Sequence, residues 1–215
     1  MKIAVFDLDG TIADTLNDLA DAVNYGLETL GFPVHECEKY KYMVGNGAKT
    51  LCFRALPDDK KEYTEKLHMF FNEYYGEHFL DRVKLYPEIK ETLTKLSENN
   101  VMLAVATNKP QIFAVKMVSV LLPDIKFIKV LGGCEERPKK PYPDIIYEIL
   151  ECTGFSEAFM VGDSNVDIDT AKNAGITSIG CAWGFRGREE LIRSGADFIA
   201  ETPNDIAEFI LKGES

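Results

Sequence analysis

Short apolar runs alternate with amphipathic stretches along most of this chain. Three of the runs end directly in polar residues: 3–6 before Asp7, 101–106 before Thr107, and 159–161 before Gly162-Asp163. Runs of this length that stop at polar residues indicate buried β-strands. Weaker candidates for strands lie at 127–130, 176–180 and 198–200.

Helical periodicity fills the intervals between these strands. Apolar residues recur every three or four positions after Pro87, Pro110 and Pro143, and Gly154 follows the last of these stretches. Proline in the first turn and glycine beyond the last are common at helix ends. The alternation predicts an α/β fold with a doubly wound, Rossmann-like parallel sheet, whose ligands bind beyond the carboxyl ends of the strands. Three polar residues fall at that edge: Asp7, Thr107 and Asp163.

One segment, residues 15–82, lacks this alternation. Apolar residues recur at helical spacing over 16–30, where Thr15 and Asp18 form a possible capping box. A second stripe, after a possible cap at Asp58, consists of large side chains: Tyr63, Leu67, Phe70, Phe71, Tyr74 and Phe79. A small helical bundle needs large rings at this spacing to bury area, so we interpret the stripe as its core. We therefore predict a helical cap at 15–82, inserted into an α/β core made of 1–14 and 83–215.

Two carboxylates stand two residues apart in the stretch DLDGTIADT, which directly follows the first predicted strand. On an extended chain Asp7 and Asp9 point to the same side, where two such groups repel each other. A divalent cation would relieve the repulsion, and Gly10 allows the sharp turn that follows. The alternative is an ordinary Asp-Gly turn beside a solvated strand end. Asp14, in the same stretch, is expected to cap the next helix.

Together with three later segments, this stretch resembles the haloacid dehalogenase superfamily of aspartate-nucleophile phosphotransferases. Residues 104–108, 140–144 and 161–167 are similar to the later motifs of that family and follow in the right order. The predicted insert lies where a helical cap would sit, so the resemblance implies a fold of this family. Two further segments resemble its phosphoglycolate phosphatase-like subgroup: 44–47 and 182–186.

The resemblance implies a role for each matched residue. Asp7 would attack phosphorus and form an aspartyl phosphate, and Asp9 would serve as acid and base. Thr107 and Asn108 would bind phosphoryl oxygens, and Lys140 would neutralise their charge. A glycine-rich loop of the insert would contact the substrate: Gly45, Asn46 and Gly47.

The resemblance also implies a Mg²⁺ site, because this hard cation prefers oxygen ligands and phosphate. Its ligands would be Asp7, the backbone carbonyl of Asp9, and Asp163. Ser164 and Asp167 would lie around these ligands, with Asp167 orienting Lys140 or a metal-bound water. The neighbouring Lys139 leaves open which lysine enters the site.

The implied function is hydrolysis of a small soluble phosphate ester, with phosphoglycolate as the leading candidate. A pyrophosphatase, nucleotidase, sugar phosphatase or phosphomutase would carry the same catalytic motifs. A phospho-acceptor switch that is not an enzyme also combines a strand-end Asp with Thr and Lys. Asp9 disfavours the switch, because a long-lived phosphoryl group benefits from the lack of an acid or base beside it.

The charge and hydropathy of the chain disfavour several classes of binding partner. The formal net charge of −11 over 215 residues disfavours nucleic acid and anionic membranes, which attract clusters of Lys and Arg. No apolar stretch approaches the roughly 18 residues of a membrane span, and the first apolar run is too short for a signal peptide. We expect a cytoplasmic protein, either monomer or homodimer, with reduced thiols at all five cysteines: Cys37, Cys52, Cys134, Cys152 and Cys181.

Overall fold

The computed structural model describes residues 1–151 and 154–212. Its contacts divide the chain into two compact units, a core unit of Met1–Ala13 with Leu85–Ser215 and a cap unit of Asp14–Lys84. Both crossings between the units fall within a small two-stranded sheet, formed by β2 (Ala13–Asp14) and β3 (Lys84–Leu85).

The core unit is built on six parallel strands in the order β5-β4-β1-β6-β7-β8. The strands are β1 (Lys2–Phe6), β4 (Met102–Pro110), β5 (Lys129–Gly133), β6 (Glu157–Gly162), β7 (Thr177–Cys181) and β8 (Phe198–Ala200). The predicted α/β fold with a parallel sheet is confirmed. The predicted end of β4 at 106 is wrong, because Pro110 pairs with Gly133 beyond an irregularity in the ladder.

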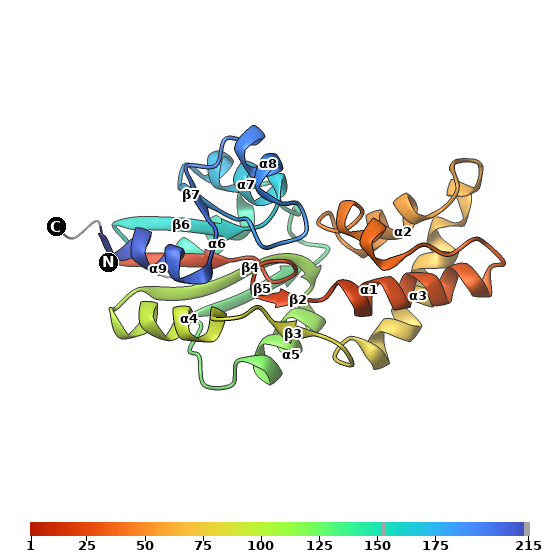
Figure 1. Ribbon diagram of the computed structural model, residues 1–215, viewed down its shortest axis with the longest axis horizontal. Helices are drawn as coiled ribbons and strands as arrows, with labels where there is room; N and C mark the ends of the chain where they lie inside the picture. The colour runs from red at the N-terminus through yellow and green to blue at the C-terminus, as the bar shows by residue number, and fades with distance from the viewer. Residues whose placement is uncertain (152–153, 213–215) are drawn as a thin grey trace. The chain divides into compact units, whose positions relative to one another are not determined.

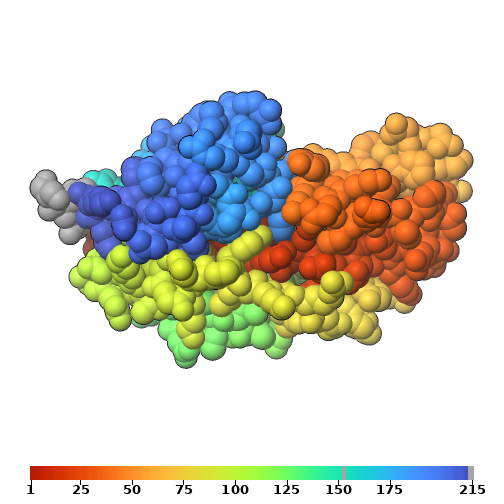
Figure 2. All heavy atoms as spheres, in the orientation of Figure 1, coloured from red at the N-terminus to blue at the C-terminus, as the bar shows by residue number. Residues whose placement is uncertain are grey.

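Helices follow the strands and cover both faces of this sheet. They are α4 (Ile89–Glu98), α5 (Gln111–Leu121), α6 (Asp144–Leu150), α7 (Asn165–Ala174), α8 (Arg188–Arg193) and α9 (Pro203–Leu211). Figure 1 shows α7 and α8 on one side of the sheet and α4 and α5 on the other. In the space-filling view, the yellow-green atoms of α4 lie against the dark blue atoms of α9 (Figure 2).

The centre of the core lies at β1, whose five residues are all buried. Ile3 and Val5 pack with the apolar face of α6 and with Ala104 and Ala106 of β4. Each fully buried aliphatic side chain contributes on the order of 2 kcal/mol to folding. A central strand of this kind fixes the position of whatever follows its last residue.

The strand register brings together the polar residues at the carboxyl ends of three strands. Phe6, the last residue of β1, pairs with Val105 of β4 and with Val161 of β6. Asp7 therefore leaves the sheet between the strand that carries Thr107 and the strand that precedes Asp163. Because the strands are parallel, all three side chains lie at the same sheet edge.

The cap unit consists of helices and 3₁₀ turns. They are α1 (Leu16–Thr29), η1 (Cys37–Tyr42), α2 (Ala48–Ala55), η2 (Asp58–Tyr63) and α3 (Thr64–His78). The predicted stripe of α3 is buried at Leu67, Phe71 and Phe79, whereas Tyr63, Phe70 and Tyr74 are only partly buried. Tyr75, which the predicted stripe omitted, is buried and stacks on Phe71.

Two predicted helix caps of this unit are wrong. The Thr15 hydroxyl makes no capping hydrogen bond, and Asp18 instead accepts hydrogen bonds from the backbone N–H groups of Arg82 and Val83. A buried carboxylate needs such partners, and these tie the end of the unit back to α1. Asp58 begins η2, while α3 starts later at Thr64. Asp14 lies one residue before the N-cap position of α1, and its Oδ1 accepts a hydrogen bond from Leu16 N at 3.2 Å.

The cysteines of the described part of the chain are free thiols. Cys52 and Cys181 are buried, whereas Cys37 and Cys134 are partly exposed, and Cys152 lies outside the described residues.

Over residues 1–151 and 154–212, each helix is too short or too polar to cross a lipid bilayer.

Candidate active site

Asp7 is the first residue beyond β1, and its position is fixed by both backbone and side chain. Its backbone N–H donates to the carbonyl of Val161 at 2.8 Å, which continues the pairing of β1 with β6. The side chain is buried, and its Oδ1 accepts no hydrogen bond, although Lys140 Nζ lies 3.0 Å away as an ion pair. A strand-end carboxylate with an unused lone pair is thus held at the sheet edge.

Three carboxylates converge beside this oxygen. Asp7, Asp163 and Asp167 are buried, and one oxygen of each lies within 4.8 Å of the others. Asp163 Oδ2 accepts a hydrogen bond from the backbone N–H of Phe185 at 2.7 Å. Asp167 Oδ2 accepts hydrogen bonds from Ser164 N and Oγ, at 3.1 and 2.7 Å, which close the capping box of α7.

Glycines provide the room for this acidic cluster. A Cβ on Gly184 would lie 2.1 Å from Asp163 Cβ, and one on Gly162 would lie 2.2 Å from Asp167 Cγ. Gly10 has a φ of 82°, a conformation that other residues rarely adopt, and its Cβ would also meet Asp163. Any larger residue at these positions would displace a carboxylate.

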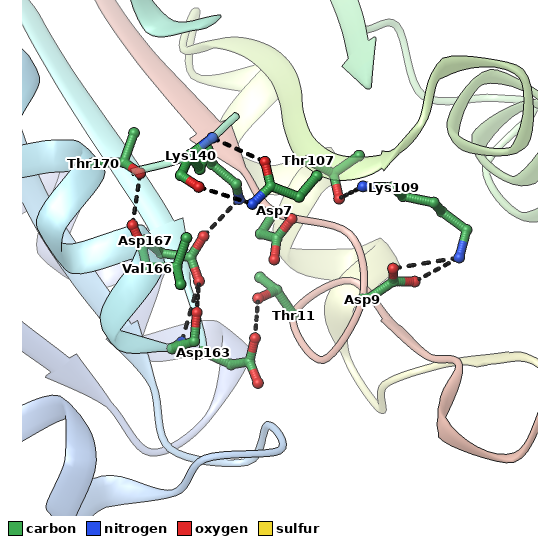
Figure 3. Close-up of polar contacts among 12 residues, drawn as sticks. Asp7, Asp9, Thr11, Thr107, Lys109, Lys140, Asp163, Val166, Asp167 and Thr170 are labelled. Carbon is green, nitrogen blue, oxygen red and sulfur yellow. Dashed lines mark hydrogen bonds and ion pairs between the residues drawn. The ribbon is translucent and has the colours of Figure 1, made fainter. Parts of the chain in front are cut away.

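Lys140 supplies the positive charge between two of the carboxylates. Its side chain is 1% exposed, and Nζ lies 3.0 Å from Asp7 Oδ1 and 2.6 Å from Asp167 Oδ1. Lys139 is exposed, so Lys140 is the lysine that enters the cluster. Figure 3 shows Lys140 reaching between Asp7 and Asp167.

The pKa values in the acidic cluster follow from burial of the carboxylates and from the one ammonium group, Lys140, beside them. Burial raises the pKa of Asp7 to about 6, Lys140 opposes this shift, and Asp167 and Asp9 reinforce it. Burial also raises the pKa of Asp163 well above its ordinary value. Burial acts to lower the pKa of Lys140, but Asp167 and Asp7 more than offset it and the pKa is raised. Lys140 alone therefore does not offset the negative charge of the three carboxylates, which favours the binding of a divalent cation.

The side chain of Asn108 clamps the backbone of Lys140. Its Nδ2 donates to the carbonyl of Lys140 at 3.0 Å, and its Oδ1 accepts from Lys140 N at 2.9 Å. Both residues are buried. The Asn108 side chain thus fixes the chain that carries Lys140, and a contact of Asn108 with a phosphoryl oxygen stays a prediction. Thr107, also buried, accepts a hydrogen bond on Oγ1 from the backbone N–H of Lys109 at 3.3 Å.

Asn108→Ala is expected to destabilise the chain by about 2 kcal/mol, because the buried N–H and C=O of Lys140 lose these two partners. It should also lower kcat for phosphate esters by about 10-fold, since a small displacement of a charged group weakens its stabilisation of the transition state. Chemical denaturation and steady-state kinetics measure both effects. Asn99→Ala, at an exposed position, is the control. An unchanged kcat with lowered stability would contradict the positioning role.

Lys109 is a residue that the sequence reasoning missed. It is buried, and its Nζ lies 3.0 Å from Asp9 Oδ1 and 3.3 Å from Oδ2. The signal was present, because Lys109 directly follows Thr107-Asn108 at the end of a predicted strand. A lysine in that place is ordinarily solvated, so sequence by itself does not mark it.

A family model described as haloacid dehalogenase-like hydrolase matches residues 4–181 of this chain. The chain belongs to this family. It is 35% identical over 219 residues to phosphoglycolate phosphatase from Vibrio parahaemolyticus, with 98% of this chain and 96% of that protein covered. Phosphoglycolate phosphatase from Haemophilus influenzae is also 35% identical, with 92% of this chain and 93% of that protein covered.

Solved structures agree with this assignment. The crystal structure of a protein from Lactobacillus delbrueckii subsp. bulgaricus superposes with a TM-score of 0.92 at 30% identity, covering 98% of each chain. The resemblance to haloacid dehalogenase-like hydrolases and to their phosphoglycolate phosphatase-like members is confirmed, and so is the prediction of a hydrolytic enzyme.

The acidic cluster fits the divalent cation that a haloacid dehalogenase-like hydrolase generally uses. Asp7 Oδ1 is a buried oxygen without a hydrogen bond, and Asp163 and Asp167 present oxygens within 4.8 Å. Hard oxygen donors at this density suit Mg²⁺. Asp7 and Asp163 would hold the ion, which would supply positive charge to the phosphoryl oxygens and offset the repulsion between carboxylates. The backbone carbonyl of Asp9 as a third ligand stays a prediction.

The predicted substrate loop of this hydrolase lies in the cap unit. Gly47, with a φ of 88°, directly precedes α2. Asn46 Oδ1 accepts a hydrogen bond from Arg54 Nη2 at 2.8 Å, and Arg54 Nη1 donates to the carbonyl of Met43 at 2.8 Å. Arg54 therefore braces the loop within its own unit, and substrate contact by Gly45, Asn46 and Gly47 stays a prediction.

Proposed function

We propose that this chain is a Mg²⁺-dependent phosphomonoesterase that hydrolyses a small phosphate ester through an aspartyl phosphate on Asp7. One observation carries the proposal: a strand-end carboxylate with a free lone pair lies 3.0 Å from a buried lysine and beside two further carboxylates. The arrangement combines a nucleophile, a fixed positive charge and oxygen ligands for a cation in one site.

In the first half-reaction, an Asp7 oxygen attacks phosphorus. The new Asp7 O–P bond forms as the ester P–O bond breaks, and a proton passes from Asp9 to the leaving oxygen. Lys140 and Thr107 face the edge where charge on the phosphoryl oxygens must be stabilised. Burial of Asp7 favours the reaction, since a desolvated carboxylate exchanges fewer hydrogen bonds for the bond to phosphorus.

In the second half-reaction, water attacks the aspartyl phosphate. The water oxygen bonds to phosphorus, the Asp7 O–P bond breaks, and the water proton returns to Asp9, which restores both carboxyl groups. The same residue serves as acid and then as base, so each turnover ends with the site in its starting state. Inorganic phosphate and the free alcohol are the products.

Phosphoglycolate is the substrate that we propose first. Relatives that match nearly the whole chain carry the name phosphoglycolate phosphatase. Among esters of this class, phosphoglycolate is small, and its carboxylate would need a cation or N–H donors beside the phosphoryl site. Specificity would come from the cap unit, where Arg54 and the loop at 45–47 offer such groups.

The experiment is a substrate panel with the full chain and Mg²⁺. We expect the specificity constant for phosphoglycolate to exceed those for pyrophosphate, nucleotides and sugar phosphates by about 10-fold or more, a difference of roughly 1.4 kcal/mol in transition-state binding. Released phosphate is measured against protein purified in parallel with Asp7→Asn, which removes the contribution of contaminating phosphatases. Preference for another ester would overturn phosphoglycolate as the proposed substrate. The absence of turnover with every ester would overturn the proposed function.

A further inference from the structure

Among residues 1–151 and 154–212, two almost fully buried lysines each pair with an aspartate at one sheet edge. In Figure 3, Lys140 with Asp167 lies on one side of Asp7, and Lys109 with Asp9 lies on the other. The proposed reaction gives Lys140 a role in charge stabilisation but gives Lys109 no role. The second pair therefore needs its own explanation.

The Lys109–Asp9 pair spans two neighbouring strands. Asp9 follows β1 and Lys109 lies near the end of β4, and these strands are hydrogen-bonded in register up to Phe6 and Val105. The Lys109 side chain is 2% exposed and that of Asp9 is 12% exposed. Lysine is among the residues least often buried, because its ammonium group loses hydration. The chain has thus placed a desolvated ammonium group beside one particular carboxylate.

The contact geometry restrains the carboxylate. Lys109 Nζ lies within hydrogen-bond distance of both Asp9 oxygens, at 3.0 and 3.3 Å, so rotation of the carboxylate breaks a contact. The lysine is itself anchored, since its backbone N–H donates to Thr107 Oγ1 at 3.3 Å. Asp9 is thereby linked to the residue that faces the phosphoryl position.

We propose that Lys109 is a positioning residue that holds the Asp9 carboxyl group for proton transfer to and from the ester. As Asp9 gives its proton to the leaving oxygen, negative charge develops on its carboxylate, and the ammonium group already faces that charge. The inference rests on the proposed function, in which Asp9 is the acid and base. It adds a residue that acts through Asp9 and does not itself contact the ester.

The test uses two esters that differ in their need for an acid. Phosphoglycolate loses a strongly basic alkoxide, which must be protonated, whereas p-nitrophenyl phosphate loses a weakly basic phenolate, which need not be. The ratio kcat/KM reports the steps up to loss of the first product, so it isolates this transfer. For Lys109→Met we expect kcat/KM to fall by about 10-fold to 100-fold with phosphoglycolate and by less than about threefold with p-nitrophenyl phosphate.

A double-mutant cycle with Asp9→Asn supplies the second readout. If Lys109 acts through Asp9, Lys109→Met should change the residual phosphoglycolate activity of Asp9→Asn by less than about threefold, since coupled residues are not additive. Lys116→Met, at an exposed position on α5, is the matched control and should match the wild type. Lys109→Gln, which keeps a hydrogen-bond donor, replaces the Met variant if circular dichroism shows that the latter is unfolded.

The outcomes separate failure of the positioning role of Lys109 from failure of the proposed function. Equal losses with both esters, an effect on KM only, or full additivity with Asp9→Asn would overturn the positioning role, because Lys109 would then serve the fold or the phosphoryl group. No turnover of either ester by the wild type would overturn the proposed function and this inference with it. Wild-type turnover of both esters with an unaffected Lys109→Met would overturn the inference and leave the function standing.

Discussion

Asp7→Asn is expected to lower turnover of phosphate esters by at least about 10⁴-fold, because a carboxamide does not replace a carboxylate as the nucleophile. The substitution is nearly isosteric, and it removes one negative charge from a buried cluster that holds two other carboxylates. The variant should therefore fold and be as stable as the wild type or more so. Released phosphate and thermal unfolding measure the two parts.

The matched control for this prediction is Asp124→Asn. Asp124 makes a surface ion pair with Lys90 and its side chain is 74% exposed, so the same chemical change there should leave turnover unchanged. Denatured wild-type protein, quenched during turnover, should carry phosphate on the peptide that contains Asp7. Substantial turnover by Asp7→Asn, or phosphate on another residue, would remove Asp7 from the role of nucleophile.

Removal of divalent cations is expected to abolish turnover, and added Mg²⁺ should restore it, because Lys140 alone does not offset the negative charge of the acidic cluster. Asp163→Asn should weaken this restoration strongly, since Asp163 offers one of the buried oxygens. Turnover is measured after chelation and during titration with Mg²⁺. Full activity in the chelated wild type would contradict the metal site.

The same cluster predicts a pH dependence of stability in the metal-free chain. Burial raises the pKa of Asp7 from 3.8 to about 6 and raises that of Asp163 as well. Between the ordinary pKa of Asp7 and its raised value in the folded chain, the folded chain binds more protons than the unfolded chain. The free energy of unfolding should therefore fall as pH rises from about 4 to about 6. Mg²⁺ should therefore raise Tm more near pH 7.5 than near pH 5, and Asp163→Asn should reduce this difference.

Much of the core could be predicted from the sequence, because its signals are local. Apolar runs at 3–6 and 198–200 correspond to β1 and β8, and Pro110 stands directly before α5. Errors arose where partners distant in sequence decide the local structure. Asp18 looks like half of a capping box, yet it bonds to Arg82 and Val83 of the same cap unit. Such contacts override a local propensity.

The sequence by itself placed the candidate residues Asp7, Thr107 and Asp163 at one site, because polar residues directly after buried strands must meet at one edge of a parallel sheet. It also determined the family, through motifs whose order and spacing are visible along the chain. The tertiary structure decided the pairing of the charges. Lys140 rather than Lys139 enters the cluster, clamped by an asparagine 32 residues away.

Only the tertiary structure joined Lys109 to Asp9, across 100 residues of sequence. From the sequence, Asp9 is already a candidate acid and base, whereas Lys109 is an ordinary polar position beside a proline. Their contact exists because β1 and β4 lie next to each other in register, which brings the chain beyond each strand to the same place. Burial then converts that proximity into a strong electrostatic interaction, since few water molecules remain to screen it.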